Sequence, residues 1–257
     1  DRELLESCMG KDIPFILQNT APQVNFMPEL CIFDLPVAYT SITKLRETLD
    51  DATFIKMVNA VYEKKGFRLL GMGDQSFRVM TTNRKIQTLQ DFKGQKIRTM
   101  ENKYHIAFWQ SIHANPTPMT FSEVYIGLQQ GTIDAQENPY EVIVSGKIYE
   151  QQDYIVQTNH LPHLLSLIVN EEFFQSLKIE DQQVVLKAAE IAKNDARKKA
   201  DARVKERLAI ITQSGTNIIT LDEAMIKEIR KEAAVVYEDI HKQAGDAIYQ
   251  AYTKHMQ

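Results

Sequence analysis

Residues 115–139 read NPTPMTFSEVYIGLQQGTIDAQENP, and this stretch carries the clearest structural signals in the chain. Thr120 and Glu123 have the Thr-x-x-Glu spacing of a capping box, in which each residue satisfies a backbone N–H at the start of a helix. Gly131 stands where a helix-terminating glycine is expected. The spacing therefore predicts a helix that begins at Thr120 and ends before Gly131.

Polar side chains follow the strands predicted next to this helix. The sequence TIDA, residues 132–135, predicts a short strand, which places residues 136–138 just past its carboxyl end. Arg98 lies near the carboxyl end of a second predicted strand, QKIRTM, and Arg78 lies on a third, SFRVMTTN. In an open α/β sheet these strand ends face the ligand crevice, and a guanidinium can grip a carboxylate with two parallel hydrogen bonds. For each arginine alone, a surface ion pair is the competing interpretation.

The rest of the chain alternates helical and extended patterns, which favours an α/β class. Residues 52–65 place apolar side chains on one helical face before Gly66, and residues 3–9 predict a helix before Gly10. Further strands are predicted at residues 30–36, 67–73 and 216–221.

A single very long helix is predicted from Glu180 to about Ser214. Apolar residues recur there at near-helical spacing among many charged residues, without a strict heptad. At ~1.5 Å per residue this helix spans roughly 50 Å, longer than one small lobe. A connector that crosses two lobes explains it better than a coiled coil.

Composition excludes several classes of protein. The chain has 257 residues, a net charge of −4 and no long basic run, which argues against nucleic acid as a partner. No stretch approaches the ~20 apolar residues of a membrane-spanning helix. The opening residues DRELLESCMGKD lack the pattern of a signal peptide, so the chain is cytosolic, mature after cleavage, or a fragment.

The sequence contains no motif that indicates catalysis or metal binding. No nucleophile elbow, HExxH or phosphate-binding glycine loop occurs. His160 and His163 form an HxxH, but Pro162 between them would break a helix that aligned them on a metal. Cys8 and Cys31 have no metal-ligand spacing; free packed thiols are favoured over a disulfide.

Three segments together resemble one known family. KGQKIRTMEN (93–102), ANPTPMTFSEVYIGLQQGTIDAQENPY (114–140) and FDLPVAY (33–39) are similar to the solute-binding proteins of tripartite ATP-independent periplasmic (TRAP) transporters. The resemblance runs from Asp1 through at least Ile211. It implies an α/β, two-lobed, periplasmic-binding-protein-like fold with a long hinge-spanning helix.

The resemblance also implies a division of the chain. Lobe 1 would comprise residues 1–75 and 164–203, and lobe 2 residues 76–163 and 204–257. Relatives begin with a further strand-helix-strand unit before the position of Asp1, so we expect lobe 1 to lack that unit here.

The family's ligand-binding residues match several positions in this sequence. Arg98 matches the main clamp on the ligand carboxylate, and Arg78 and Asn138 match further donors. Phe121 matches the aromatic residue that packs against the ligand's carbon skeleton.

Specificity positions are matched as well. Gln18 falls where relatives direct a polar side chain at the ligand. Glu101 and Asn102 follow the arginine strand and could bind hydroxyl groups. A carboxylate at Glu101 would favour a hydroxylated acid over a second carboxylate, which it would repel; a solvated loop residue is the alternative.

A coupling network is implied too. In some relatives a Glu joins a His and an Arg to link ligand binding to lobe closure, and Glu137, His160 and Arg2 match those positions. A plain structural ion pair is the competing interpretation.

The function implied by the resemblance is capture of a small organic acid in the periplasm and its delivery to TRAP membrane components. It implies a monomer that needs no cofactor and no metal and performs no catalysis. A sensor built on the same fold is the first alternative. An enzyme acting on an organic acid, with Glu101 or Glu137 as acid or base, is the second.

Overall fold

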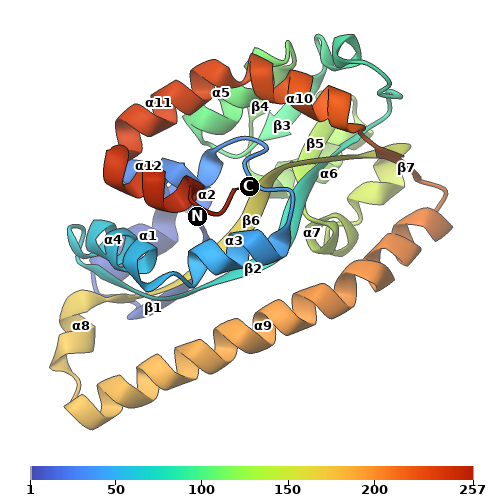
Figure 1. Ribbon diagram of the computed structural model, residues 1–257. Helices are drawn as coiled ribbons and strands as arrows, with labels where there is room; N and C mark the ends of the chain where they lie inside the picture. Colours follow the sequence, from blue (N-terminus) through green and yellow to red (C-terminus); the bar gives the residue numbers. More distant parts are fainter. Residues whose placement is uncertain (1, 257) are drawn as a thin grey trace.

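Two long antiparallel strands form the axis of the protein. The computed structural model describes residues 2–256, and in it β2 (Phe67–Thr82) pairs with β6 (Tyr154–Asn170) along nearly their whole lengths. Figure 1 shows both strands passing from one group of helices to the other. The two strands predicted at residues 67–73 and 76–83 are therefore one. The predicted break corresponds to a shift of register between Asp74 and Phe77, beside Ser76 with φ of 66°.

The other strands add to this pair as one sheet in the order β1-β6-β2-β5-β3-β4, with β7 also paired to β6. β1 and β5 run antiparallel to their partners in the long pair, whereas β3, β4 and β7 pair in parallel. The short strands are β1 (Phe15–Asn19), β3 (Lys96–Thr99), β4 (Asn115–Pro118), β5 (Ala135–Asn138) and β7 (Asn217–Thr220).

Helices cover the sheet on both faces. The α-helices are α1 (Arg2–Met9), α2 (Thr20–Gln23), α3 (Ile42–Leu49), α4 (Ala52–Glu63), α5 (Lys103–Ser111), α6 (Phe121–Gln129), α7 (Tyr140–Ser145), α8 (Glu171–Ser176), α9 (Ile179–Gln213), α10 (Glu223–Glu232), α11 (Ala234–Ala244) and α12 (Asp246–Thr253). Three 3-10 helices are η1 (Pro28–Asp34), η2 (Leu89–Phe92) and η3 (Ile148–Gln151). None of the helices in residues 2–256 has the length and apolar character needed to cross a membrane.

The predicted long helix is confirmed as α9, which has 35 residues. It lies along one side of the sheet and passes from one group of helices to the other (Figure 1). Buried Asp74 on β2 anchors it: Arg197 of α9 lies 3.5 Å from this carboxylate, which also pairs with Arg46 of α3 at 2.8 Å. The helix is therefore fixed near the point where β2 changes register.

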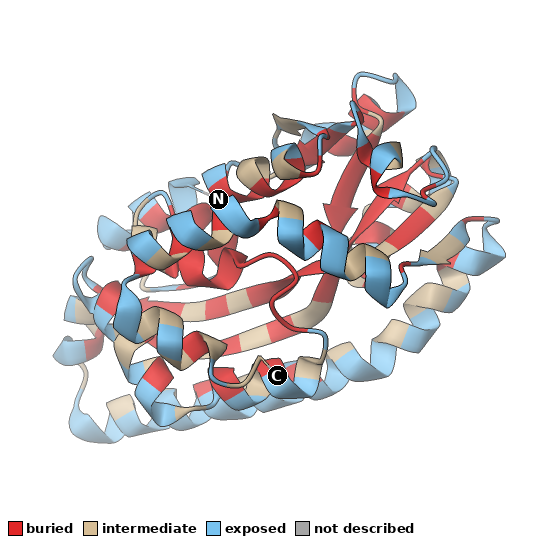
Figure 2. Ribbon diagram, turned by 45° about the horizontal axis from the view of Figure 1, so that its top comes forward, coloured by how far each residue is buried: buried red, intermediate tan, exposed pale blue. Residues whose placement is uncertain are grey.

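Buried residues form separate apolar clusters at the two ends of the sheet (Figure 2). The first cluster joins α4, η1 and the β1 end of the sheet, and it contains Phe33, Phe54 and Ile168. The second contains Trp109 and Ile97, beside β3 and α5. A third surrounds α6, α7 and β5. The first cluster at one end of the shared strands, and the second and third at the other end, agree with a two-lobed architecture.

The C-terminal segment requires a change to the predicted lobes, whose boundaries otherwise stay a prediction. Residues 204–257 were all expected in lobe 2. Instead, Val236 and Ile240 of α11 and Tyr252 of α12 are buried in the first cluster. Only α10 and the strand before it pack with the second cluster, through Leu221 and Ile229. The chain therefore crosses back to lobe 1, because α11 and α12 find their apolar partners on η1 and α4.

Two other local predictions were wrong. Residues 30–36 were expected to form a strand, but residues 28–34 form η1, which begins at a proline. The strand expected at 132–135 is β5, three residues later. The polar side chains at 136–138 therefore lie within the strand, where they pair with β2 instead of following its end.

Candidate functional site

Arg98 is a buried cation that has no carboxylate partner among residues 2–256. β3 places it in the sheet with only 3% of its surface exposed. Its Nε donates to the Met119 carbonyl at 2.9 Å, and among residues 2–256 neither Nη1 nor Nη2 has a hydrogen-bond or ion-pair partner. Burial lowers the pKa of Arg98 to about 10; Glu137 opposes that shift, and Arg78 adds to it. A buried charge without a partner is costly, so this guanidinium is suited to receive an anion.

Phe121 borders the same guanidinium. It is the first residue of α6, is 46% exposed, and lies with its ring 5.9 Å from Arg98 Cζ. Thr120 is the N-cap residue of this helix, so the predicted helix start is confirmed. The predicted capping box is not formed, because the Thr120 hydroxyl donates to the Glu123 carboxylate and caps no backbone N–H. Gly146 lies against the tip of the ring: a β-carbon added there would come within 3.1 Å of Phe121 Cζ. An aromatic face beside an unpaired arginine provides an apolar wall next to an anion site.

Arg78, by contrast, is almost fully engaged with the protein. Its Nε and Nη2 bind both carboxylate oxygens of Glu137, and Nη2 also donates to Asn138 Oδ1 at 3.0 Å. Its Nη1 lies 2.5 Å from His163 Nδ1. One N–H of Nη1 remains, so Arg78 can offer a ligand a single donor, whereas Arg98 can offer a two-pronged grip.

Glu137 links Arg78 to His160. All three side chains are at most 1% exposed, and His160 Nε2 lies 2.9 Å from Glu137 Oε2. Burial alone would raise the pKa of Glu137, but Arg78 and His160 together hold it well below its usual value. Burial lowers the pKa of His160 despite its bond to Glu137. His160 stacks on Phe108 of α5 at 5.5 Å, which connects this ion network to the second apolar cluster.

The structure corrects the predicted network in one member. Arg2 was expected to pair with Glu137 and His160. It instead pairs with Glu6, one turn along α1, and its side chain is 78% exposed. The arginine of the network is Arg78, because the antiparallel pairing of β2 with β5 places it beside Glu137.

Asn102 has a structural role and not the predicted ligand-binding one. Its Oδ1 accepts the backbone N–H groups of Tyr104 and His105 and so caps α5. Its Nδ2 donates to Asp34 at 2.7 Å and to the Ala21 carbonyl at 2.9 Å. The amide has no group left for a hydroxyl ligand.

The remaining predicted ligand residues are distributed over three elements. Asn138 is the last residue of β5. Its Nδ2 donates to Gln136 Oε1 at 2.7 Å, and its Oδ1 accepts a hydrogen bond from Arg78 Nη2. Gln18 is buried on β1, opposite Ser166 of β6. Glu101 is exposed just before α5, and its carbonyl accepts a hydrogen bond from Asn25. Their contacts with a ligand stay predictions.

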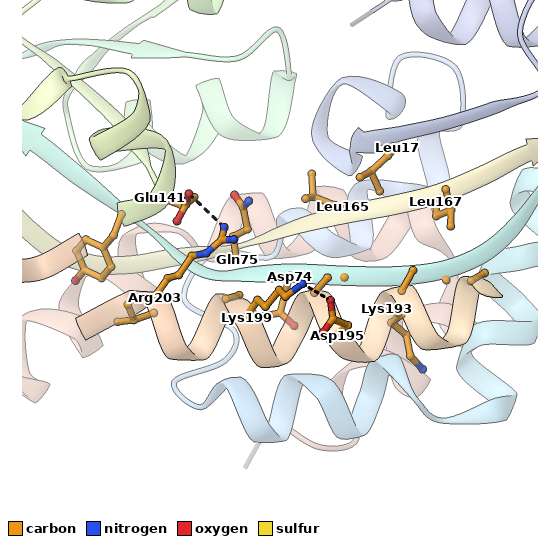
Figure 3. A pocket seen from close by; sticks show the side chains of 18 of the residues that line it. Leu17, Asp74, Gln75, Glu141, Leu165, Leu167, Lys193, Asp195, Lys199 and Arg203 are labelled. Atoms are coloured by element: carbon orange, nitrogen blue, oxygen red, sulfur yellow. Dashed lines mark ion pairs between the residues drawn. The ribbon is translucent and has the colours of Figure 1, made fainter. Parts of the chain in front are cut away.

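A separate groove lies between α9 and the sheet. It has a volume of about 520 Å³, and Leu17, Leu165 and Leu167 project into it from β1 and β6 (Figure 3). None of the predicted ligand residues lines it. Each of its cations is paired; Lys199 with Asp195 and Arg203 with Glu141 are examples. With no free cation, this groove is less suited to a carboxylate than Arg98.

Comparison with known proteins identifies the family. The family model described as bacterial extracellular solute-binding protein, family 7, matches residues 1–244. The chain belongs to this family. Members and relatives are solute-binding proteins, not enzymes.

Curated family 7 relatives are moderately similar. The ectoine-binding periplasmic protein TeaA of Halomonas elongata is 29% identical over 95% of this chain and 73% of its own length. The 2,3-diketo-L-gulonate-binding periplasmic protein YiaO of Escherichia coli is 33% identical over 84% of this chain and 66% of its own. A solute-binding protein of Verminephrobacter eiseniae is 33% identical over 80% of this chain. The match covers 64% of that relative's length, so this chain spans under two thirds of it.

Solved structures confirm the fold expected from the sequence. The TeaA structure from the TeaABC TRAP transporter has a TM-score of 0.94 at 27% identity, covering 99% of this chain and 84% of its own. A TRAP solute-binding protein from Polaromonas, bound to D-erythronate, has a TM-score of 0.91 at 30% identity. It covers 98% of this chain and 83% of its own. The α/β, two-lobed binding-protein fold is therefore established.

Proposed function

We propose that this family 7 chain captures a small carboxylate-bearing metabolite in the periplasm and delivers it to the membrane components of a TRAP transporter. One observation carries the proposal: the Arg98 guanidinium is 3% exposed, and among the described residues its two terminal nitrogens have no partner. A bound carboxylate would satisfy both nitrogens with parallel charge-assisted hydrogen bonds.

The surrounding residues divide the work of binding. Arg98 would hold the carboxylate, Phe121 would pack on the adjoining carbon atoms, and the remaining N–H of Arg78 with Asn138 would add donors. Gln18 of lobe 1 and Glu101 of lobe 2 would contribute to the choice of ligand. The relatives' ligands include galactonate and D-erythronate, which supports a sugar acid or similar carboxylate as the ligand here.

Delivery would depend on closure of the lobes, with the protein acting as a monomer. Both lobes share β2 and β6, and Ser76 and Asn159 adopt left-handed backbone conformations within them, with φ of 66° and 43°. These positions are suited to absorb the change of backbone angles that a hinge needs. The closed form would then be recognised by the membrane partner.

A thermal-shift screen tests this proposal. The chain is melted with succinate, D-erythronate, D-galactonate and orotate, in parallel with an Arg98→Met variant. Ligand at ~100 times its dissociation constant adds about 2.7 kcal/mol of stability. We expect at least one acid to raise the melting temperature of the wild type but not of the variant. Equal shifts in both proteins, or none with any acid in a cooperatively melting wild type, would overturn the proposal.

A further inference from the structure

His163 on β6 carries a hydrogen whose position can be assigned. Its Nδ1 lies 2.5 Å from Arg78 Nη1, and the side chain is only 7% exposed. A guanidinium has five N–H donors and no acceptor. Nδ1 must therefore accept the Arg78 hydrogen bond, and the imidazole hydrogen is assigned to Nε2. Burial lowers the pKa of His163 well below its usual value, and Arg78 lowers it further, so the ring stays neutral.

Asn19 leaves this Nε2–H group without an acceptor. The Asn19 Oδ1 accepts the Ala21 backbone N–H at 2.9 Å, which fixes the orientation of the amide. The Asn19 Nδ2 therefore faces the imidazole, 3.2 Å from Nδ1 and 3.5 Å from Nε2 of His163. Nδ2 is a donor, so it can share the Nδ1 lone pair but cannot accept from Nε2. Among residues 2–256, no oxygen accepts a hydrogen bond from His163 Nε2.

Around His163, hydrogen-bond donors outnumber the acceptors that are available to them. Arg78 retains one N–H on Nη1, and the carboxylate of Glu137 is already occupied by Arg78 and His160. A buried donor that lacks an acceptor destabilises the folded protein. A ligand oxygen placed here would remove that destabilisation, whereas a ligand ammonium group would face the N–H groups of His163, Asn19 and Arg78.

We propose that His163 is a specificity-determining residue, whose Nε2–H donates to a carbonyl or hydroxyl oxygen of the ligand while Arg98 holds the carboxylate. This inference rests on the proposed function and narrows it to oxo or hydroxy acids. Unsubstituted acids of the same length should bind less tightly, because they leave the His163 Nε2–H group unpaired. Amino acids of the same length should also bind less tightly, because their ammonium group would face this N–H group.

Titration calorimetry with matched acids tests the inference. The probes are 2-oxobutanoate, D-erythronate, butanoate and 2-aminobutanoate, and the variants are His163→Phe and His163→Gln. Phenylalanine keeps the ring but has no N–H. Glutamine can accept from Arg78 through Oε1 and donate through Nε2. We expect wild type to prefer an oxo or hydroxy acid over butanoate by about tenfold, the size of one satisfied hydrogen bond.

The outcomes are distinct. His163→Phe should reduce that preference to about twofold, and His163→Gln should keep most of it. If the folded His163→Phe variant weakens every acid by the same factor and keeps the wild-type preference, His163 only supports Arg78 and the inference is wrong. If wild type shows no preference, the inference is wrong while carboxylate binding stands. If wild type binds no carboxylic acid, the proposed function itself fails, and this inference fails with it.

Discussion

At the scale of single residues, two buried arginines differ in the groups that they can bind, because their neighbours differ. Arg78 is neutralised by Glu137, whereas Arg98 is buried beside Phe121 and a backbone carbonyl only. The first is therefore occupied by groups of the protein itself, and the second is left available for the proposed ligand. A buried ion pair can cost as much in desolvation as it gains, so the Arg78 pair is evidence of organisation more than of stability.

Arg98→Lys should reduce affinity for the acid found in the screen by about ten- to a hundredfold. The positive charge remains, but an ammonium group cannot reproduce the two parallel hydrogen bonds of a guanidinium. Titration calorimetry measures the change. Arg84→Lys is the matched control, because Arg84 is exposed and binds only backbone carbonyls. Unchanged affinity in Arg98→Lys would remove Arg98 from the clamp.

Stability should fall in two steps as the pH is lowered. His160 and His163 have folded pKa values below the ordinary 6.5, so the unfolded chain takes up protons first and stability is lost as the pH falls below that value. The pKa of Glu137 is held below 4.5 in the folded state, so a second loss follows below pH 4.5. Urea denaturation at about pH 7.5, 5.5 and 4 measures both steps; constant stability across this range would contradict the assignment.

The second step can be traced to Glu137 with one variant. Glu137→Gln leaves the buried Arg78 charge unpaired, which should cost about 3–5 kcal/mol at neutral pH. It should also reduce the loss of stability below pH 4.5. The same change at Glu6, whose Arg2 partner is exposed, should have little effect on either measurement.

At the scale of elements, short polar segments position the site and the apolar core supports them. β3 brings Arg98 beside β5, and α6 begins at Phe121, so the anion donor and the apolar wall come from different elements. Their spacing depends on the close approach of α7 to the tip of the Phe121 ring, where Gly146 follows the last helical residue.

Gly146→Ala should therefore weaken ligand binding, by about two- to tenfold. Its φ of −85° suits alanine, but the new methyl group would lie within 3.1 Å of Phe121 Cζ and of the Val142 carbonyl oxygen. The half-exposed ring would have to move, which would change its placement relative to Arg98. Gly73→Ala is the control, since a β-carbon there meets nothing closer than 4.0 Å. Calorimetry that finds equal affinities for both variants would refute this role.

At the scale of the whole molecule, the shared strands β2 and β6 connect the two apolar cores. His160 lies on β6, between the ion network of Glu137 and the aromatic side chains of α5. A movement of one lobe would therefore be transmitted to both groups through this side chain. The Glu137, His160 and Arg78 network is suited to couple ligand docking to closure.

His160→Ala should alter closure more than initial docking. Without the imidazole, Glu137 loses one hydrogen bond and Phe108 loses its stacking partner. Small-angle scattering with saturating ligand should show a smaller decrease in radius of gyration than for wild type, while affinity changes less than in Arg98→Lys. His113→Asn, at an exposed position, is the control. If the radius of gyration of His160→Ala decreases as much as that of wild type when ligand binds, the coupling role is without support.

The sequence by itself determined the local elements and the main donors. The helix from Thr120, the length of α9 and the placement of Arg98 on a strand follow from periodicity, glycine stops and motif order, which act over a few residues. The strand that contains Asn138 was predicted three residues too early. Tertiary structure alone decided which arginine joins Glu137, that Asn102 is consumed as a cap, and that α11 and α12 return to lobe 1. The physical reason is that these outcomes depend on burial and on hydrogen-bond partners contributed by residues distant in the chain. His163 shows this most clearly, because the contact with Arg78 of β2 decides which ring nitrogen of His163 carries the hydrogen.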